Sequence, residues 1–274
     1  MKRVIVLSDM HCGSHYGLTP PSWHSDPNKD TPPEIKKAEK TRQALWEIFD
    51  EEVRKLAPYD ICICNGDAID GDQWRQGGIE LLEPDRLRQA EMAARCIAKT
   101  HAKQIFIVAG TGYHAGERED LERVVCGHLE RLGYGPKVSM HDHLYANIDG
   151  VRFDCKHHVG GSSIPHGRFT SVRKEGLWAD AWSRKGVTPG SPEILIRSHV
   201  HYFSACLDSL GWYITTPGLQ GLGSNYGVRR CSGIVDWGFI VFDVYGPEYD
   251  CMFVPHFVLP EEANTVQKVE EVVC

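Results

Sequence analysis

The amino-acid sequence predicts an α/β (α+β) protein in which two packed, mixed β-sheets are flanked by helices. In the first half, short apolar segments alternate with segments of helical periodicity, the order that builds a parallel sheet. In the later half, apolar segments follow one another with short turns between them, which indicates a second sheet. Because there is no internal repeat and no linker-like change in composition, we expect one domain over residues 1–260 and a surface tail over residues 261–274.

The first half has the order β-α-β-α-β-α. Its expected strands are residues 3–8, 60–65 and 104–109, and its expected helices are residues 34–56, 84–101 and 117–132. The first helix ends before Pro58, and the second begins near Pro84, where a missing N–H is tolerated. Parallel strands joined by right-handed crossovers place the loops that follow the strands at one edge of the sheet.

The later half begins with a hairpin around the two-residue turn Asp149-Gly150. Its strands are expected at residues 143–148, 151–157, 193–198, 202–208, 211–216, 237–245 and 249–257, with a helix around residues 177–182. Two polar segments, residues 12–33 and 162–186, stand out between the patterned segments. Because loops of this length are usually functional, we expect both to form walls of a cleft.

Composition limits the class of protein. A net charge of -7 and a pI of about 6.0 argue against a broad basic face that coats nucleic acid. The chain has no run of about 18 apolar residues, the length that a membrane span needs, so no membrane partner is expected. The N-terminal apolar run ends at Ser8-Asp9, without a signal-peptide cleavage site. The ten scattered cysteines are typical of reduced core residues in a cytoplasmic protein.

Acidic residues and histidines follow five of the expected strands. They are Asp9 and His11, Asp67 and Asp70, His114, His157 and His158, and His199 and His201. In an extended chain, residues two apart point to the same side, so Asp9 and His11 can bind one ion together, as can His199 and His201. A carboxylate such as that of Asp67 can bridge two ions. Mixed Asp/His sites suit first-row divalent metals.

Each of these short motifs also has an ordinary structural explanation. Asp67 follows a glycine and could be a turn residue. The His199-x-His201 pair could lie on a surface strand, and His157-His158 could be polar residues of the hairpin. Five such motifs, each at the end of an expected strand, favour a shared metal site over chance.

The order of the motifs resembles that of the calcineurin-like metallophosphoesterase superfamily, over residues 3 to about 245. The family pattern is D-x-H, G-D-x-x-D, G-N-H-D/E, a lone His and G-H-x-H. The third motif is here GTGYHAGE, which lacks the Asn and has His114 two residues later, and the fifth is SHVH, with Ser198 for Gly. The resemblance implies the family's four-layer sandwich. The matching residues are Asp9, His11, Gly66, Asp67, Asp70, His157 or His158, His199 and His201.

By this resemblance, the protein holds two divalent ions, Mn, Fe, Zn or Ni, with manganese as the preferred expectation. The ligands of the first ion would be Asp9, His11, Asp67 and His201. The second ion would have Asp67, His157 and His199, completed by a group from the third loop. That group is either Thr111, at the position of the missing Asn, or His114.

The resemblance also implies catalytic residues. We favour the family's catalytic role for His114, beside the leaving oxygen, with Tyr113 and Glu117 orienting its ring. Asp70 is expected to work through the ligands, by accepting a hydrogen bond that orients His11.

The implied activity is hydrolysis of a phosphate mono- or diester by attack of a hydroxide that bridges the two ions. A small phosphate ester or nucleotide-like substrate is preferred over nucleic acid. Alternatives are a metal-dependent DNA or RNA nuclease of the same fold and a non-catalytic binding scaffold, which the altered third motif would suit. Neither the metal nor the oligomeric state follows from the sequence. Stacking faces and phosphate contacts are available from Trp23, Trp74, Trp178 and Trp182, and from His15, Arg75, His166 and Arg168.

Overall fold

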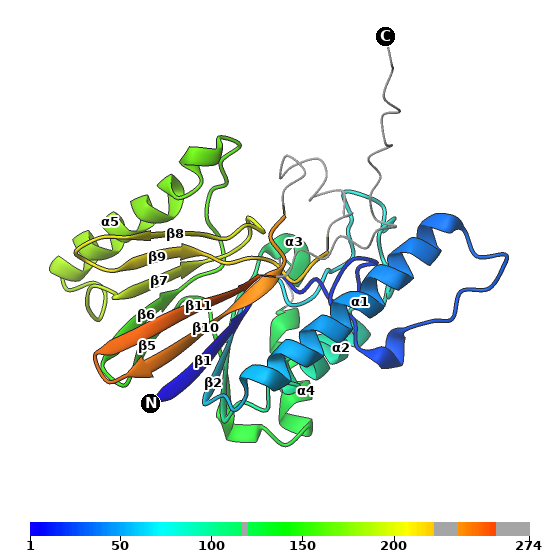
Figure 1. The fold of residues 1–274 in the computed structure, drawn as a ribbon, viewed down its shortest axis with the longest axis horizontal. Coiled ribbons are helices and arrows are strands. Elements are labelled where there is room, and N and C mark those ends of the chain that lie inside the picture. Colours follow the sequence, from blue (N-terminus) through cyan, green and yellow to red (C-terminus); the bar gives the residue numbers. More distant parts are fainter. Residues whose placement is uncertain (117–119, 222–234, 256–274) are drawn as a thin grey trace, which may run out of the picture.

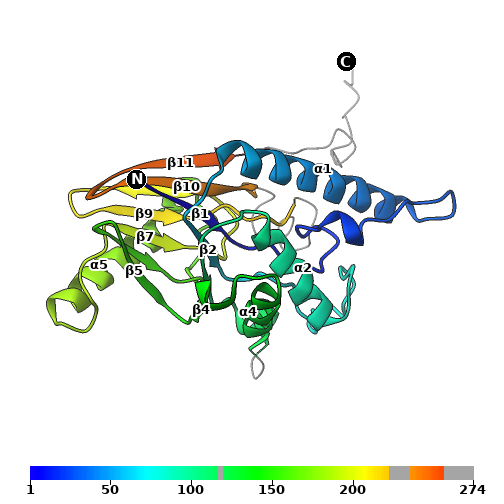
Figure 2. The same ribbon diagram turned by 90° about the horizontal axis from the view of Figure 1, so that it is seen from below.

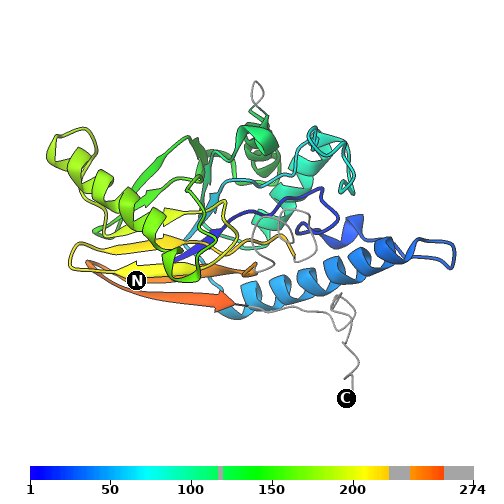
Figure 3. The ribbon, with the colours of Figure 1, turned by 90° about the horizontal axis from the view of Figure 1, so that it is seen from above.

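The computed structural model describes residues 1–116, 120–221 and 235–255 of the chain (Figure 1). Within these ranges, two β-sheets pack face to face, and helices cover their outer faces (Figures 2 and 3). This confirms the predicted fold class. The helices are α1 (Pro33–Leu56), α2 (Arg86–Ala98), α3 (Gly112–Ala115), α4 (Leu121–Arg131) and α5 (Thr170–Arg184), with 3-10 turns η1 (Pro21–Trp23), η2 (Gly135–Lys137) and η3 (Pro165–Gly167).

In the described part of the chain, the first sheet has the strand order β11-β10-β1-β2-β3-β4. Its strands are β1 (Lys2–Leu7), β2 (Ile61–Asn65), β3 (Gln104–Val108), β4 (Val138–His141), β10 (Gly238–Tyr245) and β11 (Glu248–Pro255). Strands β1 to β4 are parallel, and β10 and β11 add an antiparallel pair at the other side. The loops after β1, β2 and β3 therefore leave the sheet at one edge, as the β-α-β order predicts.

The second sheet has the order β5-β6-β7-β9-β8 among the described residues. Its strands are β5 (Leu144–Ile148), β6 (Val151–Cys155), β7 (Ile194–Arg197), β8 (Ser204–Leu207) and β9 (Trp212–Thr215). β6, β7 and β9 are parallel, whereas β5 and β8 are antiparallel to their neighbours. The loops after β6 and β7 therefore also leave their sheet at one edge.

Side-chain alternation along the strands divides the core into layers. Val4 belongs to the core between the two sheets, and its neighbour Ile5 belongs to the core under α1, α2 and α4. In the second sheet, Ile194 faces the first sheet and Leu195 faces α5. Because successive residues of a strand point to opposite faces, each sheet is buried on both sides. The resulting layers are, in order, the helices α1, α2 and α4, the first sheet, the second sheet and the helix α5.

Local sequence explains where the helices begin. The carboxylate of Asp85 accepts hydrogen bonds from the backbone N–H groups of Leu87 and Arg88, and so caps α2. Asp120 caps α4 in the same way, through the N–H of Arg123. Both caps satisfy donors that the first turn of a helix leaves unpaired.

Helix α5 occupies most of the segment that was expected to form a cleft wall. Its Gly176 packs so closely on Tyr213 of β9 that a Cβ atom there would lie 1.9 Å from the ring. The guanidinium of Arg173 lies over the same ring, at 4.5 Å. Residues 170–184 thus cover the outer face of the second sheet, and the cleft-wall role of the rest of the segment stays a prediction.

Two described elements were not predicted. Strand β4 is short and lies at the edge of the first sheet, and α3 is a single helical turn, so neither has enough residues for a recognisable period. Helix α5 is longer than the expected residues 177–182. The expected tail, residues 261–274, and the last two residues of the strand 249–257 lie outside the described residues.

None of the described helices combines the length and the apolar character that crossing a membrane requires. The cysteines in the described ranges are free.

Candidate metal centre

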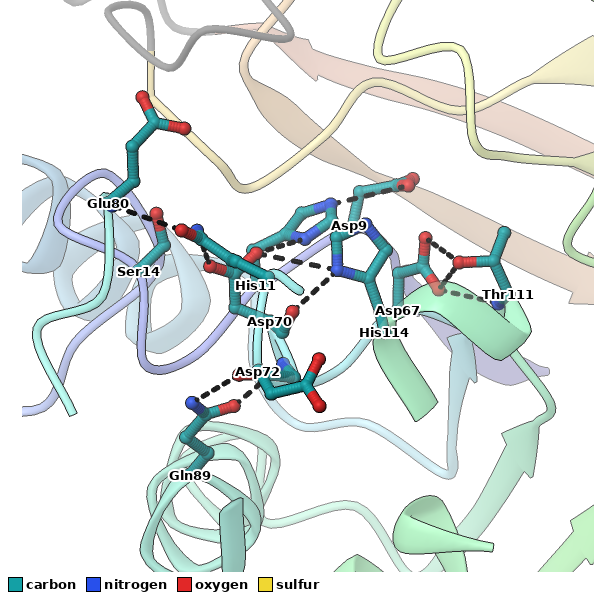
Figure 4. Close-up of polar contacts among 12 residues, drawn as sticks. Asp9, His11, Ser14, Asp67, Asp70, Asp72, Glu80, Gln89, Thr111 and His114 are labelled. Atoms are coloured by element: carbon teal, nitrogen blue, oxygen red, sulfur yellow. Dashed lines mark hydrogen bonds and ion pairs between the residues drawn. The ribbon is translucent and has the colours of Figure 1, made fainter. Parts of the chain in front are cut away.

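Five loops bring the acidic residues and histidines of the sequence motifs to one place. The loops follow β1, β2 and β3 of the first sheet and β6 and β7 of the second. Figure 4 shows Asp9, His11, Asp67 and His114 from the first three loops pointing toward one another. Three groups of described residues have ligand atoms within 4.8 Å of one another. They are Asp9, His11 and His201; His11, Asp67 and His114; and Asp67, His157 and His199.

The first group consists of Asp9, His11 and His201. The two Nε2 atoms of His11 and His201 lie 3.2 Å apart. The Oδ1 atom of Asp9 lies 3.2 Å from Nε2 of His201 and 4.0 Å from Nε2 of His11. Ligand atoms about 2 Å from one ion lie about 3 to 3.5 Å from each other, so this spacing fits a shared divalent cation.

The carboxylate of Asp9 is held by one oxygen and leaves the other facing the histidines. Oδ2 accepts hydrogen bonds from the hydroxyl of Ser8 and the backbone N–H of His199. Oδ1 is buried and has no hydrogen-bond partner. Burial opposes ionisation of Asp9, but the imidazoles of His201 and His157 outweigh it and hold the pKa of this carboxyl well below its usual range. An unpaired buried anionic oxygen among imidazole nitrogens fits a metal ion.

The third group consists of Asp67, His157 and His199. Nδ1 of His157 donates to the backbone carbonyl of Asn65 at 2.7 Å, and its Nε2 lies 3.0 Å from Oδ2 of Asp67 without a hydrogen bond. Burial alone would lower the pKa of His157, but the carboxylates of Asp67 and Asp9 raise it to about 10. Burial, and beyond it the charge of His157, lower the pKa of His199 to about 4. The chemistry of this donor set also fits a divalent cation.

The structure distinguishes the two adjacent histidines after β6. His157 is 2% exposed and faces Asp67, whereas His158 is exposed and packs its ring against that of His199, 4.8 Å away between centroids. Of the two open candidates, His157 therefore lies where a ligand would be.

Asp70 contacts two imidazoles. Its Oδ1 lies 3.1 Å from Nδ1 of His11, and its backbone carbonyl accepts a hydrogen bond from Nδ1 of His114 at 2.7 Å (Figure 4). The first contact is the one expected from the sequence. Because Nδ1 is used in both rings, the Nε2 atoms of His11 and His114 are the ones directed to the metal-binding groups.

Thr111, at the position of the family's Asn, binds Asp67. Its backbone N–H and its hydroxyl donate to Oδ1 of Asp67, at 2.7 and 3.0 Å. His114 follows on the short helix α3 and has a ligand atom within 4.8 Å of those of Asp67 and His11. Thr111 thus binds Asp67 directly and His114 lies near it, and which of the two would complete the ligand set stays open.

The backbone of the site is unusual. Asp9, His11, Asp67, His199 and His201 have φ angles of 50, 44, 48, 73 and 52°. They are five of the eight non-glycine residues with positive φ in the described ranges. This left-handed conformation is uncommon for residues with a Cβ atom, and its clustering at one place is typical of functional sites.

Two glycines of the motifs are required by close packing. A Cβ atom at Gly66 would lie 2.5 Å from Nδ1 of His157, and one at Gly110 would lie 2.3 Å from Oδ1 of Asp67. Any larger residue would displace the candidate ligands.

The buried carboxylate of Glu122 on α4 also belongs to the site and was not predicted from the sequence. It accepts hydrogen bonds from the backbone N–H groups of Gly110 and Ala68, at 2.6 and 3.3 Å. Burial, and then the charge of Asp67, raise the pKa of Glu122 to about 7. In the sequence Glu122 resembles any other charged residue of an amphipathic helix. The contact with Gly110, 12 residues earlier in the chain, leaves no local signal.

The candidate ligands lie where the loops of two face-to-face mixed sheets meet, in the order of the five sequence motifs. This architecture is the one that the resemblance to the calcineurin-like metallophosphoesterase superfamily implies. A search of protein-family models finds no match to the sequence, and a search of curated proteins finds none either.

Several solved structures align with most of the chain at low sequence identity. A single-site mutant of Vps29 from Entamoeba histolytica has 12% sequence identity and a TM-score of 0.44, and covers 93% of this chain and 99% of its own. A protein described as a novel archaeal phosphodiesterase has 16% identity and a TM-score of 0.44, and covers 92% and 99%. A predicted phosphoesterase from Streptococcus pneumoniae has 13% identity and a TM-score of 0.40, and covers 93% and 89%. Similarities this low carry no information about activity or substrate.

The residues that the sequence suggested for base stacking and phosphate contacts lie in different parts of the fold. His15 accepts a hydrogen bond from the guanidinium of Arg42, and the guanidinium of Arg168 lies over the ring of Tyr202. Trp178 and Trp182 are exposed on α5, at the outer face of the second sheet, and so lie away from the loops of the site. Trp23 packs against the core under α1 and α2, and His166 belongs to η3. Glu117, the expected partner of His114, lies outside the described residues.

Proposed function

We propose that the protein is a phosphoesterase that hydrolyses a phosphate mono- or diester with two divalent metal ions. Manganese is the preferred metal. The observation that carries the proposal is the presence of two separate groups of three ligands that the intermediate group of His11, Asp67 and His114 links. The first ion would be held by Asp9, His11 and His201, and the second by Asp67, His157 and His199. Asp67 would also reach the first ion, as the bridging carboxylate that the family resemblance implies. Two bound ions supply a nucleophilic water at neutral pH and neutralise the oxygens of the phosphate.

The protein's own residues position these groups. Ser8 and the backbone of His199 fix the carboxylate of Asp9, and Asn65 and Asp70 fix the rings of His157 and His11. Such contacts set the direction of each lone pair before an ion arrives.

His114 is suited to handle the proton of the leaving group. Its Nδ1–H is held by the backbone carbonyl of Asp70, and the Asp70 carboxylate lies 3.5 Å from the same nitrogen. With Nδ1 held in this way, Nε2 is the ring nitrogen that faces the candidate ligands. A proton at Nε2 can pass to the departing alkoxide.

The test combines metal content with turnover. With manganese present, the purified protein is expected to bind two ions per chain and to hydrolyse a chromogenic phosphodiester or phosphomonoester. Asp67→Ala is expected to lose both ions and all activity, because Asp67 belongs to the group with His157 and His199 and to the intermediate group that contains His11. Asp142→Ala, a change at an exposed loop residue, is the matched control and is expected to keep both. One ion or none, without turnover, would favour a non-catalytic scaffold.

A further inference from the structure

Two exposed side chains, Trp74 and Arg75, and the half-buried Tyr113 lie beside His114. We call Trp74, Arg75 and Tyr113 the aromatic ledge. The ring of Tyr113 lies 4.8 Å from that of His114, and the ring of Trp74 lies 5.8 Å from that of Tyr113, between centroids. His114 in turn lies 4.4 Å from His11. The aromatic ledge therefore continues a row of rings outward from the metal-binding groups.

Trp74 is presented to solvent by an anchored loop. Its side chain is 57% exposed, although an indole normally buries most of its surface. Its neighbour Gln73 is buried and donates to the carboxylate of Asp70, while its own side-chain oxygen accepts from the N–H of Glu80. The backbone N–H of Trp74 donates to Asp72 at 3.2 Å. The ring is thus held in place, and a ligand would lose little entropy in ordering it.

Arg75 adds a positive charge to this surface. The centre of its guanidinium lies 4.7 Å from the ring centroid of Trp74 and 5.4 Å from that of Tyr113, in cation–π contact with both. No carboxylate among the described residues forms an ion pair with Arg75. Because rings contact the flat face of a guanidinium, its N–H groups remain directed along its edge, where they can bind a phosphate oxygen.

We propose that the aromatic ledge binds the nucleoside part of a phosphodiester, with the base stacked on Trp74 and an anionic oxygen bound by Arg75. This rests on the proposed phosphoesterase function, because the ledge lies on the side of His114, where the leaving oxygen departs. In the reaction, the oxygen of water joins phosphorus, the bond from phosphorus to the nucleoside oxygen breaks, and that oxygen takes a proton. Base stacking and phosphate binding occur with mononucleotide esters and with single-stranded nucleic acid alike.

The kinetic test compares the methyl ester of a nucleoside 5′-monophosphate, which can release the nucleoside, with the methyl ester of ribose 5-phosphate, which is the same diester without a base. Wild-type protein with manganese is expected to prefer the nucleoside compound in kcat/KM. Trp74→Ala is expected to reduce this preference about tenfold, the size of one base-stacking contact, and Trp74→Phe to restore most of it. Trp178→Ala is the matched control, because Trp178 is equally exposed, at 57%, but lies on α5. A preference that Trp74→Ala leaves intact would overturn the proposal.

A binding test separates the ledge from the reaction. Calorimetry compares adenosine 5′-monophosphate with ribose 5-phosphate on the wild-type, Trp74→Ala and Arg75→Gln proteins. If no ester is hydrolysed but the adenine improves binding in a Trp74-dependent manner, the phosphoesterase function fails and the ledge stands. If esters are hydrolysed but neither the preference nor the nucleotide affinity depends on Trp74, the ledge fails and the function stands. Tighter Trp74-dependent binding of a short single-stranded oligonucleotide than of the mononucleotide would identify nucleic acid as the source of the base.

Discussion

At the scale of single residues, the candidate ligands combine an unfavourable backbone with a well-fixed side chain. A non-glycine residue in the left-handed region costs about 1–3 kcal/mol, and five candidate ligands share that conformation. Their imidazoles and carboxylates are meanwhile held by neighbours such as Ser8, Asn65 and Asp70. Packing of the surrounding sheets must offset the free energy that this left-handed backbone costs.

The role of His114 can be tested by a single substitution. His114→Ala is expected to lower kcat about 10²- to 10⁴-fold and to leave two ions bound, because the change removes a proton donor rather than a ligand. Steady-state kinetics with manganese and elemental analysis of the same samples measure both quantities. His128→Ala, on α4, is the control. Loss of one ion together with the activity would make His114 the ligand that replaces the missing Asn.

At the scale of elements, α4 is tied to the loops of the site by one side chain. Glu122 accepts from backbone N–H groups in the loops after β2 and β3, which carry Asp67 and Thr111. The helix thus fixes the spacing between two loops that the sheet alone leaves free.

Replacing Glu122 should therefore affect both stability and metal binding. Glu122→Ala leaves the N–H groups of Gly110 and Ala68 without their acceptor, at about 1–3 kcal/mol each, so the free energy of unfolding is expected to fall by about 2–6 kcal/mol. Metal affinity is expected to weaken as well, because Asp67 is next to Ala68. Urea unfolding and metal titration measure the two effects, with Glu130→Ala on the exposed face of α4 as the control. Unchanged stability would show that water replaces the carboxylate.

Strands β6 and β7 share a buried ion pair. Arg197 donates to Oδ1 of Asp154 at 2.8 Å, and His143 contacts the same oxygen at 2.7 Å. Burial opposes ionisation of Asp154, but His143 and Arg197 outweigh it and lower the pKa of its carboxyl below the ordinary 3.8.

Asp154→Asn is expected to destabilise the protein by about 3–5 kcal/mol at neutral pH, because it leaves the buried charge of Arg197 with only the more distant carboxylate of Glu175, at 3.8 Å. Since the folded pKa of Asp154 is depressed, its contribution is full above the ordinary value of 3.8 and is lost as the pH falls through the folded value. The difference in the free energy of unfolding between the wild type and Asp154→Asn should therefore become smaller in acid. Denaturant unfolding over a pH series measures it, and a constant difference would contradict the assignment.

At the scale of the whole molecule, the candidate metal centre joins the two sheets. Asp9, His11 and Asp67 follow strands of the first sheet, and His157 and His201 follow strands of the second. Bound ions would therefore act as links across the interface between the sheets, in addition to the apolar core there.

Metal binding is accordingly expected to stabilise the folded state as a unit. Manganese at about 100 times its dissociation constant should raise the free energy of unfolding by about 2.7 kcal/mol per site, and a chelator should reverse the change. Thermal unfolding with and without manganese measures the effect. Asp142→Ala should respond like the wild type, and Asp67→Ala should not respond; equal responses of both variants would place the ions elsewhere.

The fold could be predicted from sequence because its signals are local. The period of apolar residues in α1, the proline near the start of α2, and the Asp149-Gly150 turn each lie within a few residues of the element they define. Strand β4 was not predicted because its four residues, at the edge of the sheet, show no recognisable period of apolar residues. The same locality made the five short motifs visible as strand-end groups.

The sequence by itself determined the class of fold, the order of its main elements and the acidic and histidine residues that the loops carry. Only the tertiary structure decided that His157 rather than His158 faces Asp67, that Thr111 donates to that carboxylate, and that Glu122 ties the loops together. The physical reason is that neighbouring side chains differ in direction, not in local pattern. Which of them meets a partner 44 or 90 residues away depends on how the two sheets pack.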